Sequence, residues 1–210
     1  MKLTRGQIIT NIVCLLPFSI LAVGYFRGSL TANPIQALTL RSGHTALNLL
    51  MLTLAFRPLS SLLGLTALLR IRVILGVYAF FYAFFHFLVF TGLDFEFNSV
   101  WIGEEIRFKP FIQIGLASLI LLIPLTITSF SRIRKSMGKS WQVLHRLAYG
   151  AAALAVTHYL MASKGDYVVP AVYGMVLVLL MLLRLPPLNK IKLQNQPQWL
   201  TIINQFLLKT

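Results

Sequence analysis

The chain alternates between long runs of apolar residues and short polar segments. A helix needs about 20 mainly apolar residues to cross the hydrocarbon core of a membrane, and six runs approach or reach that length. They predict an all-α, polytopic membrane protein built as a six-transmembrane-helix bundle. No repeat or linker is evident in the sequence, so residues 1–210 are expected to form one domain. The predicted spans are Ile8–Phe26, Gly43–Phe56, Val73–Leu93, Phe111–Phe130, Val143–Met161 and Val168–Leu185.

Two segments outside these spans also have an apolar character. The second span is short because Arg57 and Pro58 follow it, and proline removes a backbone donor from a helix. The next stretch, Leu59–Leu69, is apolar and is predicted to lie along the membrane surface. The tail after Pro186-Pro187 is predicted to be amphipathic and to lie on the cytoplasmic surface.

Composition supports the same class. Hydrophobic residues make up 57% of the chain and charged residues 11%, with a mean hydropathy of +0.77. Soluble domains contain about 45–50% apolar and roughly 25% charged residues, and a short chain cannot hide this much apolar surface from water. A soluble enzyme, a disordered chain and a nucleic-acid-binding protein are therefore excluded as first interpretations. The single cysteine, Cys14, excludes a disulfide scaffold.

The charged residues separate by side of the membrane. The chain has 19 basic and 5 acidic residues. With six spans, the termini and the loops on their side carry 14 basic residues and no acidic one, whereas the opposite side carries 5 of each. The positive-inside rule places the basic side, and both termini, in the cytoplasm. The sequence therefore predicts a multi-pass membrane protein with both termini in the cytoplasm, and most of these charges are expected to anchor helix ends.

Two of the four histidines lie at similar depth inside predicted spans. His86 lies in the third span and His158 in the fifth, both toward the outer side. Ligand-type side chains are costly in a membrane and often functional, and two imidazoles facing each other in a bundle can be the axial ligands of a b-type haem. Zinc fits less well, because it usually takes four ligands including cysteine or carboxylate. The alternative is a pair of buried histidines that bond to backbone or hydroxyl groups.

The other candidate residues lie at the ends of the spans. His145 opens the fifth span on the cytoplasmic side, and its spacing from His158 corresponds to roughly 20 Å along a helix. Arg72 lies 14 residues before His86, at the cytoplasmic edge. It could pair with a haem propionate or a flavin phosphate, or simply anchor the helix in the interface. His44 opens the second span on the outer side and is a possible further ligand.

Several segments together resemble a known family. They are Ser42–Leu47, Arg70–Gly76, Gly138–Tyr149 and the triplet His158-Tyr159-Leu160. They are similar to the haem-binding membrane subunit, MsrQ, of the bacterial periplasmic methionine sulfoxide reductase system. That family belongs to the ferric-reductase-like transmembrane superfamily, as do the membrane domains of NADPH oxidases. The resemblance covers nearly the whole chain, and its most specific part is the segment from Gly138 to His145.

This resemblance implies an electron-transfer subunit rather than a catalytic one. Electrons from a cytosolic flavin reductase or from quinol would cross the membrane through one or two b haems, with FMN as a further cofactor. They would reach a periplasmic molybdopterin-containing subunit that reduces methionine sulfoxide in oxidised proteins. By position, His86, His145 and His158 match the family's haem-linked histidines, whereas His44 does not. Relatives with two bis-histidine haems carry a second histidine where this chain has Arg72, so the axial partner of His145 is open.

Two other functions remain open from the residues alone. The chain contains neither a G-x-G-x-x-G motif after a strand nor a P-loop, so a separate electron donor is expected. A stand-alone ferric or quinone reductase would use the same histidines. A cofactor-free transporter or membrane anchor would not need them, but transporters often place carboxylates near the midplane, and the predicted spans contain none there.

Overall fold

The computed structural model describes residues 3–185 and 197–209, and every regular element within them is a helix. Residues 186–196, which include Pro186-Pro187 and the start of the predicted tail, lie outside this description. The helices are α1 (Arg5–Phe26), α2 (Pro34–Leu63), α3 (Ala67–Leu88) with the π-helical turn η1 (Val89–Asp94), α4 (Ser99–Phe108), α5 (Pro110–Ile127), α6 (Ser131–Met137), α7 (Lys139–Leu144), α8 (Leu147–Ala162), α9 (Val168–Leu182) and α10 (Gln198–Leu208).

Four helical segments are long and apolar enough to cross a membrane: α1, α2, α3 continued through η1, and α5. Helix α9 is equally apolar but shorter. Large aliphatic side chains point outward from the bundle, as Ile20, Ile120 and Met175 do with 63%, 54% and 64% of their surface exposed. In lipid such exposure carries no penalty, because the hydrocarbon is as apolar as the side chains. The prediction of an all-helical, multi-pass membrane protein is confirmed.

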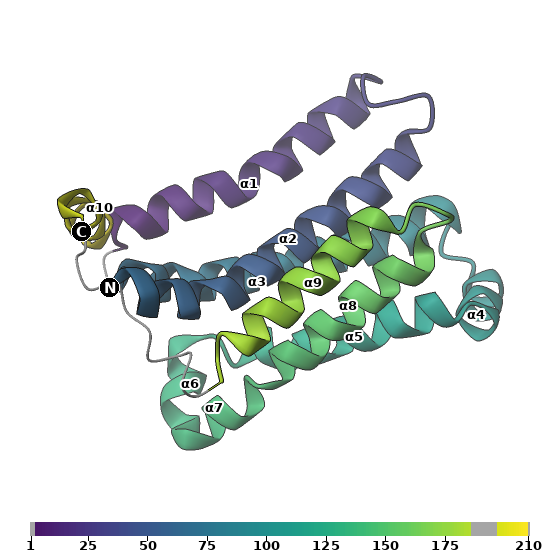
Figure 1. Ribbon diagram of the computed structural model, residues 1–210. Coiled ribbons are helices and arrows are strands. Elements are labelled where there is room, and N and C mark those ends of the chain that lie inside the picture. Colours follow the sequence, from purple (N-terminus) through teal and green to yellow (C-terminus); the bar gives the residue numbers. More distant parts are fainter. Residues whose placement is uncertain (1–2, 186–196, 210) are drawn as a thin grey trace.

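The centre of the fold is a ring of four helices. Helix α2 packs along α3, α5 packs along α8, and the two pairs meet where α3 contacts α5 and α2 contacts α8. Helix α1 covers α3, and α9 covers α8 and α2 from outside. Figure 1 shows α4 at one end of the bundle, and α6, α7 and α10 at the end where both termini lie. We call these the α4 end and the α10 end.

Helix α2 does not stop where the sequence predicts. Pro58 lies inside it, and the helix continues to Leu63 before Gly64 turns the chain with φ of 67°. The missing N–H of Pro58 leaves the Leu54 carbonyl without its helical donor, and the guanidinium of Arg184 donates to that carbonyl instead. The predicted surface stretch Leu59–Leu69 is therefore wrong: it is the end of α2, a short turn and the start of α3.

The fifth predicted span also differs. The chain bends at His145, which caps α7, and α8 begins only at Leu147. A single helix over Val143–Met161 was expected, so the spacing of roughly 20 Å along one helix does not apply between His145 and His158. The bend places the His145 ring next to Trp141 of α7 and Thr128 at the end of α5.

The two helix pairs of the ring correspond to each other at a fixed offset of 72 residues. Ala67 starts α3 and Lys139 starts α7, whereas α2 shifted by 72 residues falls on α5 and α6. The same shift takes α3 onto α7 and α8. The contacts agree with a pseudo-twofold relation, because exchanging the pairs turns the α3–α5 contact into the α8–α2 contact. This correspondence is not evident in the sequence, where few residues match outside the helix faces that point inward.

Candidate functional site

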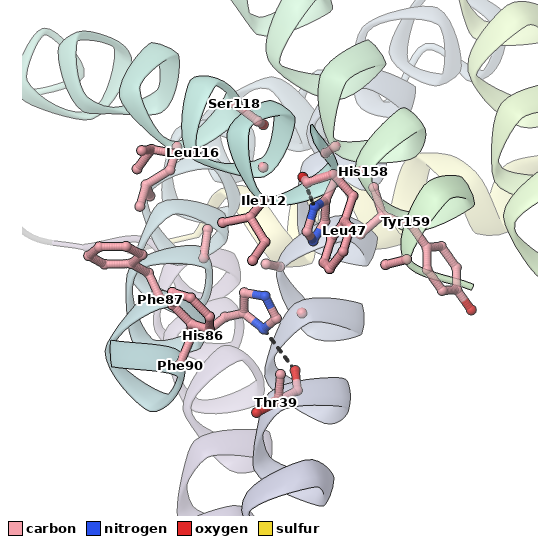
Figure 2. A pocket seen from close by; sticks show the side chains of 18 of the residues that line it. Thr39, Leu47, His86, Phe87, Phe90, Ile112, Leu116, Ser118, His158 and Tyr159 are labelled. Carbon is pink, nitrogen blue, oxygen red and sulfur yellow. Dashed lines mark hydrogen bonds between the residues drawn. The ribbon is translucent and has the colours of Figure 1, made fainter. Parts of the chain in front are cut away.

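A cavity of about 550 Å³ lies inside the four-helix ring. Its volume falls within the range of about 300–1,000 Å³ typical of small-molecule and cofactor sites. Most of its lining is apolar, and at the α4 end it is bordered by Asp94 and by the ion pair of Lys109 with Glu105. Figure 2 shows His86, from α3, and His158, from α8, on different walls of this cavity. The sequence prediction that these two histidines lie close together is thus met by the fold.

The hydrogen bonds of the two histidines define their tautomers. His86 Nδ1 lies 2.8 Å from the Thr39 carbonyl oxygen, and His158 Nδ1 lies 2.7 Å from the Phe111 carbonyl oxygen. A carbonyl can only accept, so each Nδ1 carries the hydrogen and each Nε2 keeps its lone pair. Metal-binding histidines commonly make such a bond to a backbone carbonyl through the nitrogen that does not bind the metal. Both rings therefore present a metal-binding nitrogen.

The separation of the rings fits a single iron between them. Their centroids are 6.2 Å apart and their planes meet at 81°. Metal–imidazole bonds are about 2.0–2.1 Å, and a ring nitrogen lies roughly 1.1 Å from its ring centre, so two axial imidazoles on one metal have centroids roughly 6.2–6.4 Å apart. In the described residues no group of three or more His, Cys, Asp or Glu side chains could hold a metal ion. The remaining ligands would have to come from a cofactor, as the four nitrogens of a porphyrin do.

The cavity follows the 72-residue correspondence of the helix pairs. Eleven pairs of lining residues are separated by that offset, one member from α2, α3 or η1 and the other from α5 or α8. Five of these pairs are identical: Gly43 and Gly115, Leu47 and Leu119, Leu50 and Leu122, Ala83 and Ala155, and His86 and His158. His86 and His158 thus occupy equivalent positions in the two pseudo-symmetric halves of the cavity wall.

His44 breaks this equivalence, since its counterpart is Leu116. It was expected at the outer edge of the second span, but α2 begins at Pro34, so His44 lies ten residues inside the helix. It lines the cavity and packs edge-on to Tyr159 with ring centroids 5.0 Å apart. Its Nε2 atom is buried and has no hydrogen-bond partner among the described residues.

A second pocket, of about 660 Å³, lies at the α10 end. Three arginines line it, Arg57, Arg72 and Arg146, and no acidic residue does so in the part of the chain that the structure describes. His145 and Tyr149 complete one wall, and the Trp141 ring lies 4.0 Å from the His145 ring. Three guanidinium groups gathered without a carboxylate among the described lining residues favour an anionic ligand.

The tautomer of His145 differs from that of the other two histidines. Thr128 Oγ1 lies 2.7 Å from the Pro124 carbonyl oxygen and 3.0 Å from His145 Nε2. The hydroxyl has one hydrogen, which it donates to the carbonyl, so it accepts from His145 Nε2–H. His145 therefore keeps its lone pair on Nδ1. No second histidine lines this pocket among the described residues.

Comparison with known proteins shows the family of this chain. A family model described as ferric reductase like transmembrane component matches residues 42–156. A relative from Rhodospirillum rubrum is 40% identical over 185 residues, which is 87% of this chain and 88% of the relative. Relatives from Herminiimonas arsenicoxydans (41%, 87% of this chain and 85% of the relative) and Caulobacter vibrioides (39%, 82% and 83%) are similar. All three are named protein-methionine-sulfoxide reductase heme-binding subunit MsrQ.

The chain belongs to the MsrQ family. Within it, the part matched by the ferric-reductase-like family model begins in α2 and ends in α8, and so covers nearly all of the four-helix ring. Helices α1, α9 and α10 lie outside that part. His158 follows its last matched residue by two positions.

Sequence reasoning about this MsrQ-family chain missed several residues around both pockets. The carbonyls of Thr39 and Phe111 left no signal, because backbone groups of any residue can accept a hydrogen bond. Arg57 was interpreted only as the end of a span, but it lines the second pocket. Gly43 and Gly115 could have been found, because they share the 72-residue separation of the two histidines.

Proposed function

We propose that this protein is the haem b-binding membrane subunit of a methionine sulfoxide reductase system, and that it passes electrons across the bacterial inner membrane. The observation that carries the proposal is the His86–His158 pair, whose ring centroids are 6.2 Å apart and whose Nδ1 atoms both bond to backbone carbonyls, so that each Nε2 keeps its lone pair. The names of its relatives support the same function. The terminal acceptor would be a periplasmic molybdopterin-containing catalytic subunit.

His86 and His158 would hold the haem iron from its two faces. The bound haem would supply a one-electron carrier within the membrane. The chain's own contribution is to fix each imidazole through a backbone carbonyl and to surround the macrocycle with apolar side chains that exclude water. We propose His44 as a further polar contact to the cofactor, because its buried Nε2 atom has no hydrogen-bond partner in the part of the chain that the structure describes.

The second pocket would hold an anionic redox cofactor. Arg72 and Arg57 suit a phosphate or a propionate, which fits both FMN and a second haem. We propose His145 as a third haem-linked residue. Because its Nε2 atom carries the hydrogen, it would bind iron through Nδ1. The lack of a second histidine in the pocket favours the flavin over a six-coordinate haem.

The charge distribution supports a direction for the electrons. The arginine-lined pocket lies near the α10 end, and the positive-inside rule would place this end, with both termini, in the cytoplasm. A cytosolic flavin reductase or a quinol would donate there. The cavity with His86 and His158 extends to charged residues at the α4 end, among them Asp94 and Lys109, and a periplasmic partner would dock at that end.

A spectrum tests the proposal directly. Protein purified from haem-replete cells should show the dithionite-reduced minus oxidised difference spectrum of a low-spin b haem, quantified as the pyridine haemochrome. A colourless preparation would overturn the proposal and favour a cofactor-free anchor or transporter.

The family-model match favours one alternative, a stand-alone ferric or quinone reductase. Rapid turnover of a ferric chelate or a quinone by the purified subunit alone would support it. Electron delivery only to the methionine sulfoxide reductase would exclude it.

A further inference from the structure

The same three-part arrangement surrounds each of the two cavity histidines. A backbone carbonyl on one helix accepts from Nδ1, a glycine follows four residues later on that helix, and the histidine comes 47 residues after the carbonyl. In the first helix pair these are Thr39, Gly43 and His86. In the second pair, the equivalent residues lie 72 positions further along the chain. Each imidazole therefore lies over one turn of the facing helix, with its Nδ1 atom bonded to a carbonyl and its Nδ1–Cε1 edge next to a glycine.

The glycines leave no spare room for a side chain. A Cβ atom on Gly43 would lie 3.1 Å from His86 Nδ1 and 3.2 Å from its Cε1. A Cβ atom on Gly115 would lie 2.7 Å from His158 Nδ1 and 2.9 Å from its Cε1. The second clash is more severe than the first, so the two positions offer a graded test.

We propose that Gly43 and Gly115 are paired positioning residues, which set the plane and depth of the two axial imidazoles. The inference rests on the proposed haem function. Neither glycine requires positive φ, and a helix interior normally disfavours glycine by about 1 kcal/mol relative to alanine. Because glycine has no Cβ atom, it allows the imidazole to approach the helix backbone closely.

This contact fixes what the hydrogen bond alone leaves free. A bond from Nδ1 to a carbonyl still allows the ring to rotate about the bond and to move along it. The glycine surface blocks both movements from one side, and the iron would block them from the other. The two glycines belong to different helices, α2 and α5, and the planes of the two rings that they contact meet at 81°.

Alanine substitution at four helical glycines separates this role from a general effect on helices. The test variants are Gly43→Ala and Gly115→Ala. The matched controls are Gly76→Ala and Gly150→Ala, where the new Cβ would meet Thr53 and Leu121 no closer than an ordinary 3.7 Å. All four substitutions raise helix propensity equally, so propensity cannot distinguish test from control.

Three measurements on the purified full chain report the outcome: haem per protein, the electron paramagnetic resonance g values, and the melting temperature of haem-free protein. The g values of a low-spin haem depend on the angle between its axial imidazoles. We expect haem retention to fall about tenfold in Gly115→Ala, a typical effect of disturbing the groups that orient a metal ligand, and less in Gly43→Ala. Both should have shifted g values, and the controls should match the wild type.

Equal behaviour of all four variants would overturn the inference while leaving the haem proposal intact. So would a larger loss in Gly43→Ala than in Gly115→Ala. If Gly115→Ala does not fold, the g values of the milder Gly43→Ala still test the inference. A purely structural role of Gly43 would lower the haem-free melting temperature and leave the g values of the bound haem unchanged. A wild-type protein without haem would instead refute the proposed function.

Discussion

Replacing His44 with leucine should affect the haem-free and haem-loaded protein in opposite directions. The Nε2 atom of His44 is buried without a partner among the described residues, and a buried polar group in that condition costs about 1–3 kcal/mol. Inside a bilayer no water is at hand to relieve it. Leucine is the residue that the second helix pair carries at the equivalent position, Leu116, so the cavity wall already accommodates that shape once.

In the haem-free protein the substitution should stabilise the fold. Removing the unpaired atom should return about 1–2 kcal/mol, which corresponds to a rise of roughly 2–8 °C in melting temperature for a domain of this size. In the haem-loaded protein, His44 is proposed to donate to the polar edge of the cofactor. Losing a hydrogen bond to a charged group costs about 1.5–3 kcal/mol, so haem should dissociate about one to two decades more readily.

The assay compares wild type, His44→Leu and the control Thr45→Val, which removes a hydroxyl from the next residue of α2. Haem-free melting temperature and the rate of haem transfer to an apoglobin acceptor are measured for each. The absorption spectrum should stay that of a bis-histidine haem, because His86 and His158 remain. Unchanged haem transfer together with a higher melting temperature would make His44 a merely tolerated polar residue. Loss of the low-spin spectrum would place His44 in the ligand set.

Three further predictions concern the two cavity histidines, the arginine-lined pocket and the membrane topology. His86→Ala and His158→Ala should each abolish the low-spin haem spectrum, since each removes one axial bond; an intact bis-histidine spectrum in either variant would refute the pairing. Arg72→Ala should slow stopped-flow reduction of the haem by the cytosolic donor about tenfold or more, the equivalent of one lost charge-assisted hydrogen bond, with the spectrum unchanged. Arg72→Lys should recover part of the rate, because an ammonium lacks the bidentate fork; equal rates in all three proteins would reduce Arg72 to a membrane anchor. A reporter fused to the C-terminus should be active in the cytoplasm, and activity confined to the periplasm would contradict the charge argument.

Much of this fold could be predicted because the length of a run of apolar residues is a strong local signal for a membrane-spanning helix. The long runs located every helix of the ring, and equal depth in the membrane brought His86 and His158 together. The errors arose where a distant residue changes a local rule. A proline usually ends a helix. Here Arg184, 126 residues after Pro58 in the chain, donates to the carbonyl that the proline leaves free.

The rest of the site could not be predicted for a related reason. The tautomers of the histidines depend on which backbone carbonyl lies opposite each ring, and that is decided by helix packing. His145 shows this most clearly. Its position in the chain matched a family histidine, yet only the structure shows that Thr128 accepts from Nε2 and leaves Nδ1 free.

The pseudo-twofold relation of the helix pairs has a consequence for the asymmetry of the molecule. Equivalent residues of the two pairs lie at the same end of the bundle, so an exact twofold would place matching groups on both sides of each pocket. The two cavity histidines and their two glycines do match, although His44 corresponds to Leu116. Near the α10 end, Arg72 corresponds to Leu144, and His145 corresponds to Val73, so each of these candidates comes from one pair alone. Under the proposed function, exchanging residues between the pairs at the α10 end should change the choice of donor and leave the iron site as it is.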